Sequence, residues 1–231
     1  LSGIAVTGFG HSHPRISKAV EEQLKKLWHV SNLFKSEKQE KLAEMLTDAT
    51  GLSKVFFCNS GTEANEAAIK FARLYGKERF HIITALGGFH GRTMGSLSAT
   101  GQYSLWTDFK PILPGFSYVP FNDPDAIEHS INENTVAVML EPIQGEHGVI
   151  IPSEGYLKKV REICDRHDLL LILDEVQTGT GRTGKLFAYQ WEDLEPDMIT
   201  FAKGIANGFP LGGVILNEKQ RLLFMPAAMV Q

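Results

Sequence analysis

The sequence of 231 residues is poor in cysteine, with only Cys58 and Cys164. Two cysteines are too few for a disulfide framework, and they lack the paired spacing of a zinc site. We therefore expect reduced thiols in an intracellular, cytoplasmic protein that holds no metal.

Long hydrophobic runs and blocks of basic charge are also missing. The longest apolar stretches are short, such as LLLIL at 169–173, whereas a membrane-spanning helix needs roughly 20 residues. Lysine and arginine total 23 against 27 acidic residues, and the formal net charge is −4. We therefore expect neither a membrane nor a nucleic acid as a partner.

What the chain does have is apolar material for a core and an excess of glycine. Hydrophobic residues make up 43% of the sequence, which excludes intrinsic disorder. Glycine accounts for 22 of the 231 residues, above an average of roughly 7%. The glycines indicate where the backbone comes close to another group.

From residue 54 onward, short apolar runs alternate with helical patterns. Strands that are apolar throughout are buried on both faces, and their alternation with helices predicts an α/β fold with a mostly parallel sheet between helix layers. Strands are expected at 55–58, 81–84, 117–121, 136–140, 169–174, 198–202 and 213–216. Helices are expected at 62–75, 92–99, 124–131, 153–167 and 217–224.

The first 50 residues form a separate N-terminal helical segment in this interpretation. Pro14 begins a helix whose apolar residues share one face, and a second helix runs from about Glu37 to Thr47. Residues 51–231 then form one large domain. Because the chain ends at PAAMVQ, soon after a short amphipathic segment, we expect that further sequence is missing.

Ligands of a parallel sheet bind beyond the carboxyl ends of its strands. The first strand runs into Asn59-Ser60-Gly61-Thr62-Glu63 and then into an alanine-rich helix. The free amides of the first helical turn favour an anion such as phosphate. The same residues also resemble an ordinary capping box, so both interpretations stay open.

The second strand leads to a glycine-rich loop, GGFHGRT, at 87–93. Phe89 is suited to stack on a planar cofactor, and Arg92 to bind a carboxylate. The alternative is a core phenylalanine and a solvated arginine. We interpret His90 as a core residue rather than a catalytic one.

Charged residues follow three later strands. Glu141 and Glu146 follow the fourth and could pair with arginines or cationic substrates, although surface glutamates are common. Asp174 follows five apolar residues, and a carboxylate so placed needs a metal, an arginine or a protonated ring nitrogen as partner. Lys203 lies beside Gly204, where partial desolvation would make its amine nucleophilic, as imine chemistry requires.

One segment imitates a nucleotide-binding P-loop. Residues 179–185 read GTGRTGK after a strand, but the next residue is Leu186 instead of the serine or threonine that binds magnesium. A P-loop protein is therefore only a remote alternative.

Taken together, five segments resemble the class III aminotransferases, which are pyridoxal-phosphate enzymes of fold type I, the aspartate aminotransferase type. The segments occur in family order and span most of the chain. They are SGTEANEAA (60–68), FHGRT (89–93), EPIQGE (141–146), LDEVQTGTGRTG (173–184) and FAKGIANGFPLGG (201–213).

By this resemblance, Lys203 would form an imine with pyridoxal 5′-phosphate and move the substrate proton, and Asp174 would pair with the ring nitrogen. Arg92 would bind the substrate carboxylate, and Glu146 would pair with an arginine of a small C-terminal domain, which by this resemblance is missing from the sequence. The remaining cofactor-binding residues implied are Gly61 and Thr62 at the phosphate, Phe89 and Val176 on the two ring faces, Gln177 and Glu175.

Within the family, WHVSNLF (28–34), FHGRT and SATG (98–101) are most similar to acetylornithine aminotransferases. The resemblance implies conversion of N-acetylornithine and 2-oxoglutarate to N-acetylglutamate semialdehyde and glutamate, in arginine biosynthesis, by a homodimer with its active site at the interface. Aminotransferases of ornithine, succinylornithine or GABA stay open as alternatives, as does a glutamate-semialdehyde-type aminomutase. Ornithine aminotransferases usually have tryptophan in place of His90.

Overall fold

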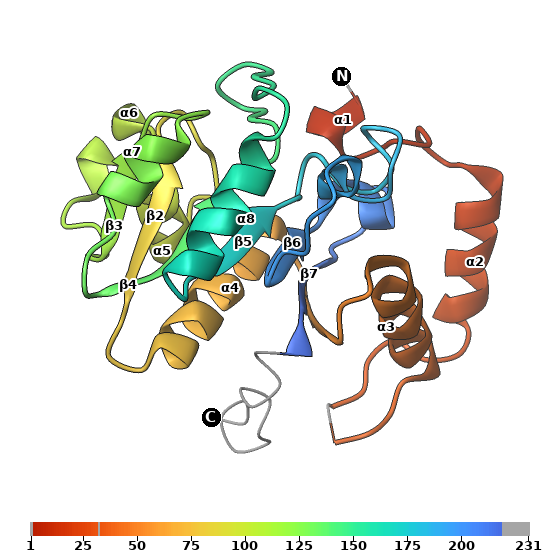
Figure 1. The fold of residues 1–231 in the computed structure, drawn as a ribbon. Helices are drawn as coiled ribbons and strands as arrows, with labels where there is room; N and C mark the ends of the chain where they lie inside the picture. Colours follow the sequence, from red (N-terminus) through yellow and green to blue (C-terminus); the bar gives the residue numbers. More distant parts are fainter. Residues whose placement is uncertain (1, 32, 219–231) are drawn as a thin grey trace.

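The computed structural model of the protein describes residues 2–31 and 33–218 (Figure 1). Its centre is a seven-stranded sheet with the order β1-β7-β6-β5-β4-β2-β3. All seven expected strands are confirmed, each within two residues of its expected ends. They are β1 (Lys54–Cys58), β2 (His81–Ala85), β3 (Phe116–Val119), β4 (Thr135–Leu140), β5 (Leu170–Asp174), β6 (Met198–Phe201) and β7 (Gly212–Leu216).

The sheet is mostly parallel, as expected. Strand β2 pairs in parallel with β3 and β4, and β4, β5 and β6 continue in the same direction. Strand β7 alone is antiparallel, to β6 and to β1. Six strands therefore share one direction, and their carboxyl ends meet at one edge of the sheet.

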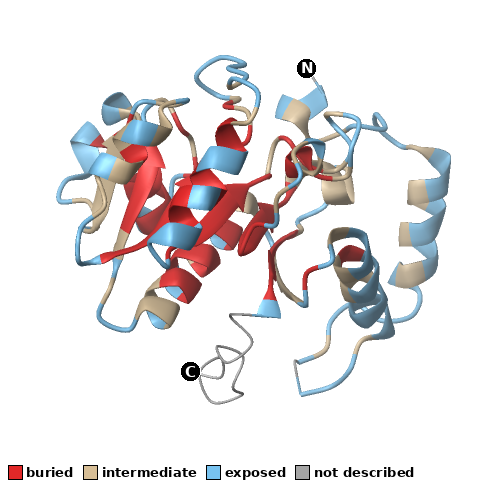
Figure 2. Ribbon diagram, viewed as in Figure 1, coloured by how far each residue is buried: buried red, intermediate tan, exposed pale blue. Residues whose placement is uncertain are grey.

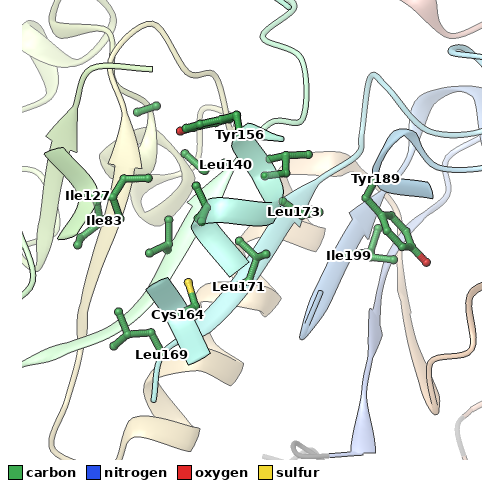
Figure 3. Packing of buried hydrophobic residues seen from close by; sticks show 14 of the residues in the cluster. Ile83, Ile127, Leu140, Tyr156, Cys164, Leu169, Leu171, Leu173, Tyr189 and Ile199 are labelled. Carbon is green, nitrogen blue, oxygen red and sulfur yellow. The ribbon is translucent and has the colours of Figure 1, made fainter. Parts of the chain in front are cut away.

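Helices cover both faces of the sheet because its strands are apolar on both sides. In β5, Leu170 and Ile172 belong to the cluster that includes α4 (Gly61–Gly76), whereas Leu171 and Leu173 belong to the cluster that includes α8 (Tyr156–Arg166). Figure 2 shows the buried strands between these helices, and Figure 3 shows the α8 side of the core. Such two-sided burial fixes the strand ends that carry the candidate site.

The remaining helices are short. The expected helices at 92–99, 124–131 and 153–167 are confirmed with shorter bounds, and that at 217–224 falls largely outside the described residues. Elements of three or four residues were not expected, because they are too short to show a period. The short elements are α5 (Met94–Ala99), α6 (Tyr103–Trp106), α7 (Pro124–His129) and the 3₁₀ helices η1 (Thr107–Phe109), η2 (Ala188–Trp191) and η3 (Lys203–Ala206).

The N-terminal segment contains α1 (Ser2–Ala5), α2 (Pro14–Leu24) and α3 (Glu37–Thr50). Helix α2 buries none of its residues, and α3 buries only Leu46. Figure 1 shows α2 at the side of the molecule, apart from the sheet. Within residues 2–31 and 33–218, no helix is both long and apolar enough to cross a bilayer.

Candidate functional site

A cavity of about 830 Å³ opens at the edge where the parallel strands end. Its walls come from the loops after β1, β2, β4, β5 and β6, together with Ile4 and Val6 of the N-terminal segment. Nine of the ten expected site residues line it. They are Gly61, Thr62, Phe89, Arg92, Glu146, Asp174, Val176, Gln177 and Lys203.

The start of α4 has both features expected from its sequence, a helix cap and a candidate anion-binding site. The Glu63 amide donates to Ser60 Oγ at 3.3 Å, and Glu63 Oε2 accepts from the Asn59 amide at 2.7 Å, so a cap is present. Among the described residues, the amides of Gly61 and Thr62 have no acceptor, and both residues line the cavity. The helix is thus capped and still presents free donors to an anion.

Gly61 also sets how closely α4 approaches the loop after β5. A Cβ at this position would lie 2.8 Å from Val176 Cγ1, which is too short for a real contact. Glycine therefore lets the helix N-terminus and Val176 lie against the same cavity.

Asp174 is held on three sides at the end of β5. Its Oδ2 accepts from Asn65 Nδ2 and from His90 Nδ1, each at 2.7 Å, and its Oδ1 accepts from the Val176 amide at 3.1 Å. The side chain is 3% exposed yet lines the cavity. A ring nitrogen was among the partners expected for this buried acid, and in the structure Nδ1 of the His90 ring contacts it.

His90 is buried, as expected, and it is also the charge partner of Asp174. Burial opposes protonation of the imidazole, but the hydrogen bond and charge of Asp174, with a smaller contribution from Glu141, raise the pKa of His90 above its ordinary value. Sequence reasoning missed this pair and Asn65, because the partners lie 84 and 109 residues from Asp174 along the chain.

Lys203 follows β6 and begins η3. Its φ of 47° lies in the left-handed region, which is unfavourable for a residue with a side chain. Burial lowers the pKa of the Lys203 amine, and the positive charge of Arg182 lowers it further, although Asp174 and Glu141 oppose the shift. More of this amine is therefore neutral, and nucleophilic, than in an exposed lysine.

The loops after β2 and β4 supply the remaining charged and aromatic residues. Phe89 is half-buried, so it is neither a core residue nor fully exposed, and Arg92 is exposed at the cavity. Glu146 is exposed as well, and its Oε2 accepts from Gln102 Nε2 at 2.7 Å. A carboxylate and a guanidinium thus stand at the open side of the cavity.

Glu175 is the one expected site residue that the structure places elsewhere. It is 1% exposed, and its carboxylate accepts from the Thr178 hydroxyl and from the amides of Ala188 and Tyr189, at 2.9 and 2.8 Å. Successive strand residues point to opposite faces, so Asp174 faces the cavity and Glu175 faces away from it. Its structural role is to anchor the start of η2.

The P-loop alternative is wrong, because the structure lacks the α-helix that a P-loop requires directly after residues 179–185. Residues 179–185 lie in turns and bends that lead into η2, whereas a P-loop opens an α-helix. Lys185 Nζ lies 5.1 Å from the centre of the Trp191 ring rather than beside a nest of backbone amides.

The sequence matches the family "Aminotransferase class-III" over residues 1–228, and the chain belongs to this family. It is 52% identical over 223 residues to an acetylornithine aminotransferase of Halalkalibacterium halodurans, covering 96% of this chain and 57% of that protein. It is 50% identical to one of Methanopyrus kandleri, covering 98% of this chain and 58% of that protein. The chain thus spans less than two thirds of the length of these relatives.

Solved structures agree with the family assignment. The ornithine aminotransferase of Toxoplasma gondii matches with a TM-score of 0.94 at 31% identity, over 99% of this chain and 56% of that one. An N-acetylornithine aminotransferase of Stenotrophomonas maltophilia matches with a TM-score of 0.83 at 44% identity, over 96% of this chain and 57% of that one. The expected α/β fold class is thereby confirmed.

Proposed function

We propose that this chain forms the cofactor-binding part of a pyridoxal-phosphate-dependent aminotransferase. The observation that carries the proposal is that Lys203, Asp174 and the free amides of α4 face one cavity. We further propose that residues 1–50 are an N-terminal helical segment and that residues 51–231 form the large domain.

The residues present fit pyridoxal phosphate in chemistry and in charge. Lys203 has an amine of lowered pKa for covalent attachment, Asp174 offers a buried carboxylate to a protonated ring nitrogen, and the start of α4 suits the phosphate. Phe89, Val176 and Gln177 line the same cavity and are assigned to the ring. Glu175 is left out of this assignment because its carboxylate is occupied at η2.

When bound, pyridoxal phosphate supplies an electron sink for the charge that develops when the amino-bearing carbon loses its proton. The chain contributes the groups around it. Lys203 takes and returns that proton at its Nζ. Asp174 would stabilise the positive charge of the ring nitrogen, and its hydrogen bonds with His90 and Asn65 fix its orientation.

N-acetylornithine is the substrate that the comparisons support best, with 2-oxoglutarate as amino acceptor. The relatives described above, at 50 and 52% identity, are both named acetylornithine aminotransferase, whereas the ornithine aminotransferase of T. gondii is 31% identical. Arg92 would bind a substrate carboxylate and Glu146 would pair with an arginine outside this chain. We place the reaction in arginine biosynthesis, in a cytoplasmic homodimer with its active site at the interface.

Turnover measurements test this assignment. Full-length protein with 2-oxoglutarate should convert N-acetylornithine with a higher kcat/KM than ornithine, succinylornithine or GABA, and Lys203→Ala protein should convert none of them. A preference for ornithine or GABA would reassign the substrate. Isomerisation of glutamate semialdehyde without any 2-oxo acid would indicate an aminomutase instead.

A further inference from the structure

Glu141 is a buried acid to which the proposed chemistry gives no task. It lies directly after β4, lines the cavity and is 7% exposed. Burial raises the pKa of its carboxyl to about 7. Because a buried carboxyl is costly unless its oxygens are hydrogen-bonded, the partners of Glu141 indicate what it does.

The two oxygens of Glu141 accept hydrogen bonds from two different loops. Oε2 accepts from the Phe89 amide at 2.9 Å, and Oε1 accepts from the Gly145 amide at 3.2 Å. Phe89 belongs to the loop after β2 and Gly145 to the loop after β4, and these strands are neighbours in the sheet. One side chain therefore joins two adjacent strand ends directly at the cavity.

Two other contacts hold the loop after β4. Gln144 Nε2 donates to the Leu86 carbonyl, in the loop after β2, at 2.9 Å, and Gln102 Nε2, in the segment between α5 and α6, donates to Glu146 Oε2 at 2.7 Å. Of these contacts, only that of Glu141 involves Phe89, the aromatic residue assigned to the cofactor ring.

Gly145 lies against the side chain of Gln177. A Cβ at Gly145 would overlap the Gln177 side-chain amide, so glycine lets that side chain approach the loop after β4 closely. Glu141 thus links the Phe89 backbone to a part of this loop that contacts a residue assigned to the cofactor.

We propose that Glu141 is a positioning residue that sets where the Phe89 ring lies in the cavity. The inference rests on the proposed function, because it concerns how this ring would stack on pyridoxal phosphate. Glu141 acts through Phe89 and not on the cofactor, since both of its oxygens are bonded to backbone amides.

Cofactor binding and its spectroscopic signature test the inference in full-length protein. With pyridoxal phosphate as ligand, we expect Glu141→Ala to raise the Kd by roughly tenfold or more and Glu141→Gln, which keeps one acceptor, to raise it less. The induced circular dichroism of the bound cofactor should weaken in the same order. The matched control is Glu154→Gln, at an exposed acid before α8, which should change neither quantity.

A double-mutant cycle with Phe89→Ala separates positioning from a general loss of structure. The factor by which Glu141→Ala raises the Kd is measured in the parent and in the Phe89→Ala protein. If Glu141 acts through Phe89, the factor in the Phe89→Ala protein should be less than half of that in the parent. Equal factors in the two backgrounds, or unchanged Kd and circular dichroism in Glu141→Ala protein, would overturn the inference. If the alanine variant does not fold, Glu141→Gln takes its place in the cycle.

Binding of pyridoxal phosphate by the unsubstituted protein distinguishes failure of the proposed function from failure of the role of Glu141. Failure of that protein to bind pyridoxal phosphate would contradict the proposed function itself. Normal binding together with an additive cycle would leave the function standing and remove only the role of Glu141.

Discussion

At the scale of single residues, the candidate site depends on a buried acid and a partly buried amine whose environments differ. Asp174 is held by hydrogen bonds from His90, Asn65 and the Val176 amide. Burial lowers the pKa of Lys203 and outweighs the opposing charges of Asp174 and Glu141. Asp174 is therefore suited to stabilise a positive charge on a bound group, and Lys203 is suited to act as a nucleophile and base.

Asp174→Asn should lower turnover by roughly 10²-fold or more, because a neutral amide cannot stabilise a protonated ring nitrogen. His90→Gln should lower it less, since glutamine keeps a hydrogen-bond donor toward Asp174. Steady-state kcat with N-acetylornithine measures both effects. Undiminished turnover in the Asp174→Asn protein would refute the role of this carboxylate.

The lowered pKa of Lys203 predicts the pH dependence of its reaction with pyridoxal phosphate. Deprotonation produces the reactive amine, so the rate should rise with pH and level off below 10.5, the ordinary lysine value. Stopped-flow absorbance of cofactor-free protein, with Lys203→Ala as baseline, gives this profile. A midpoint at or above the ordinary value would show that burial does not activate the amine.

At the scale of elements, the site is held by strands whose two faces are both buried. Leu171→Ala in β5 removes side-chain volume from the α8 side of the core, where Leu171 is 0% exposed. We expect the free energy of unfolding to fall by about 2–5 kcal/mol. Ile151→Ala, at a residue that is 71% exposed, should change it by less than about 0.5 kcal/mol in the same urea titration.

The sequence predicted elements well where the pattern is local and poorly where it depends on pairing. All seven strands were expected because apolar runs mark buried strands, but the reversed direction of β7 was not. Its residues are fully buried like those of β6 beside it, so their apolar pattern does not show the direction of the strand. Glu175 was misplaced for a related reason, because adjacent residues share a motif but face opposite sides of a strand.

The site residues likewise divide into those that a local pattern predicts and those that only the fold brings together. Lys203, Asp174 and Phe89 were expected because each directly follows, or lies in the loop after, a recognisable strand. Asn65 and His90 were not assigned to the site, and the link from Glu141 to Phe89 was not foreseen, since these partners come from other strand ends and no spacing along the chain reveals them. The parallel sheet brings these residues together, so they could be found only in the fold.

At the scale of the whole molecule, ligand binding and folding stability are linked. The cavity draws its walls from five strand ends and from the N-terminal segment, so pyridoxal phosphate would bind only the folded protein. A free concentration 100 times the Kd should stabilise the fold by about 2.7 kcal/mol. Calorimetry should therefore show a higher Tm with pyridoxal phosphate and a smaller increase for Lys203→Ala; equal increases would argue against covalent attachment at Lys203.

The most direct test of the central claim is to identify the residue that binds pyridoxal phosphate covalently. Full-length protein is incubated with the cofactor, treated with borohydride, digested and analysed by mass spectrometry. The account predicts that the reduced cofactor is found on the peptide containing Lys203, and that Lys203→Ala protein carries none. Stoichiometric modification of a different lysine, or an unchanged yield in the Lys203→Ala protein, would contradict it.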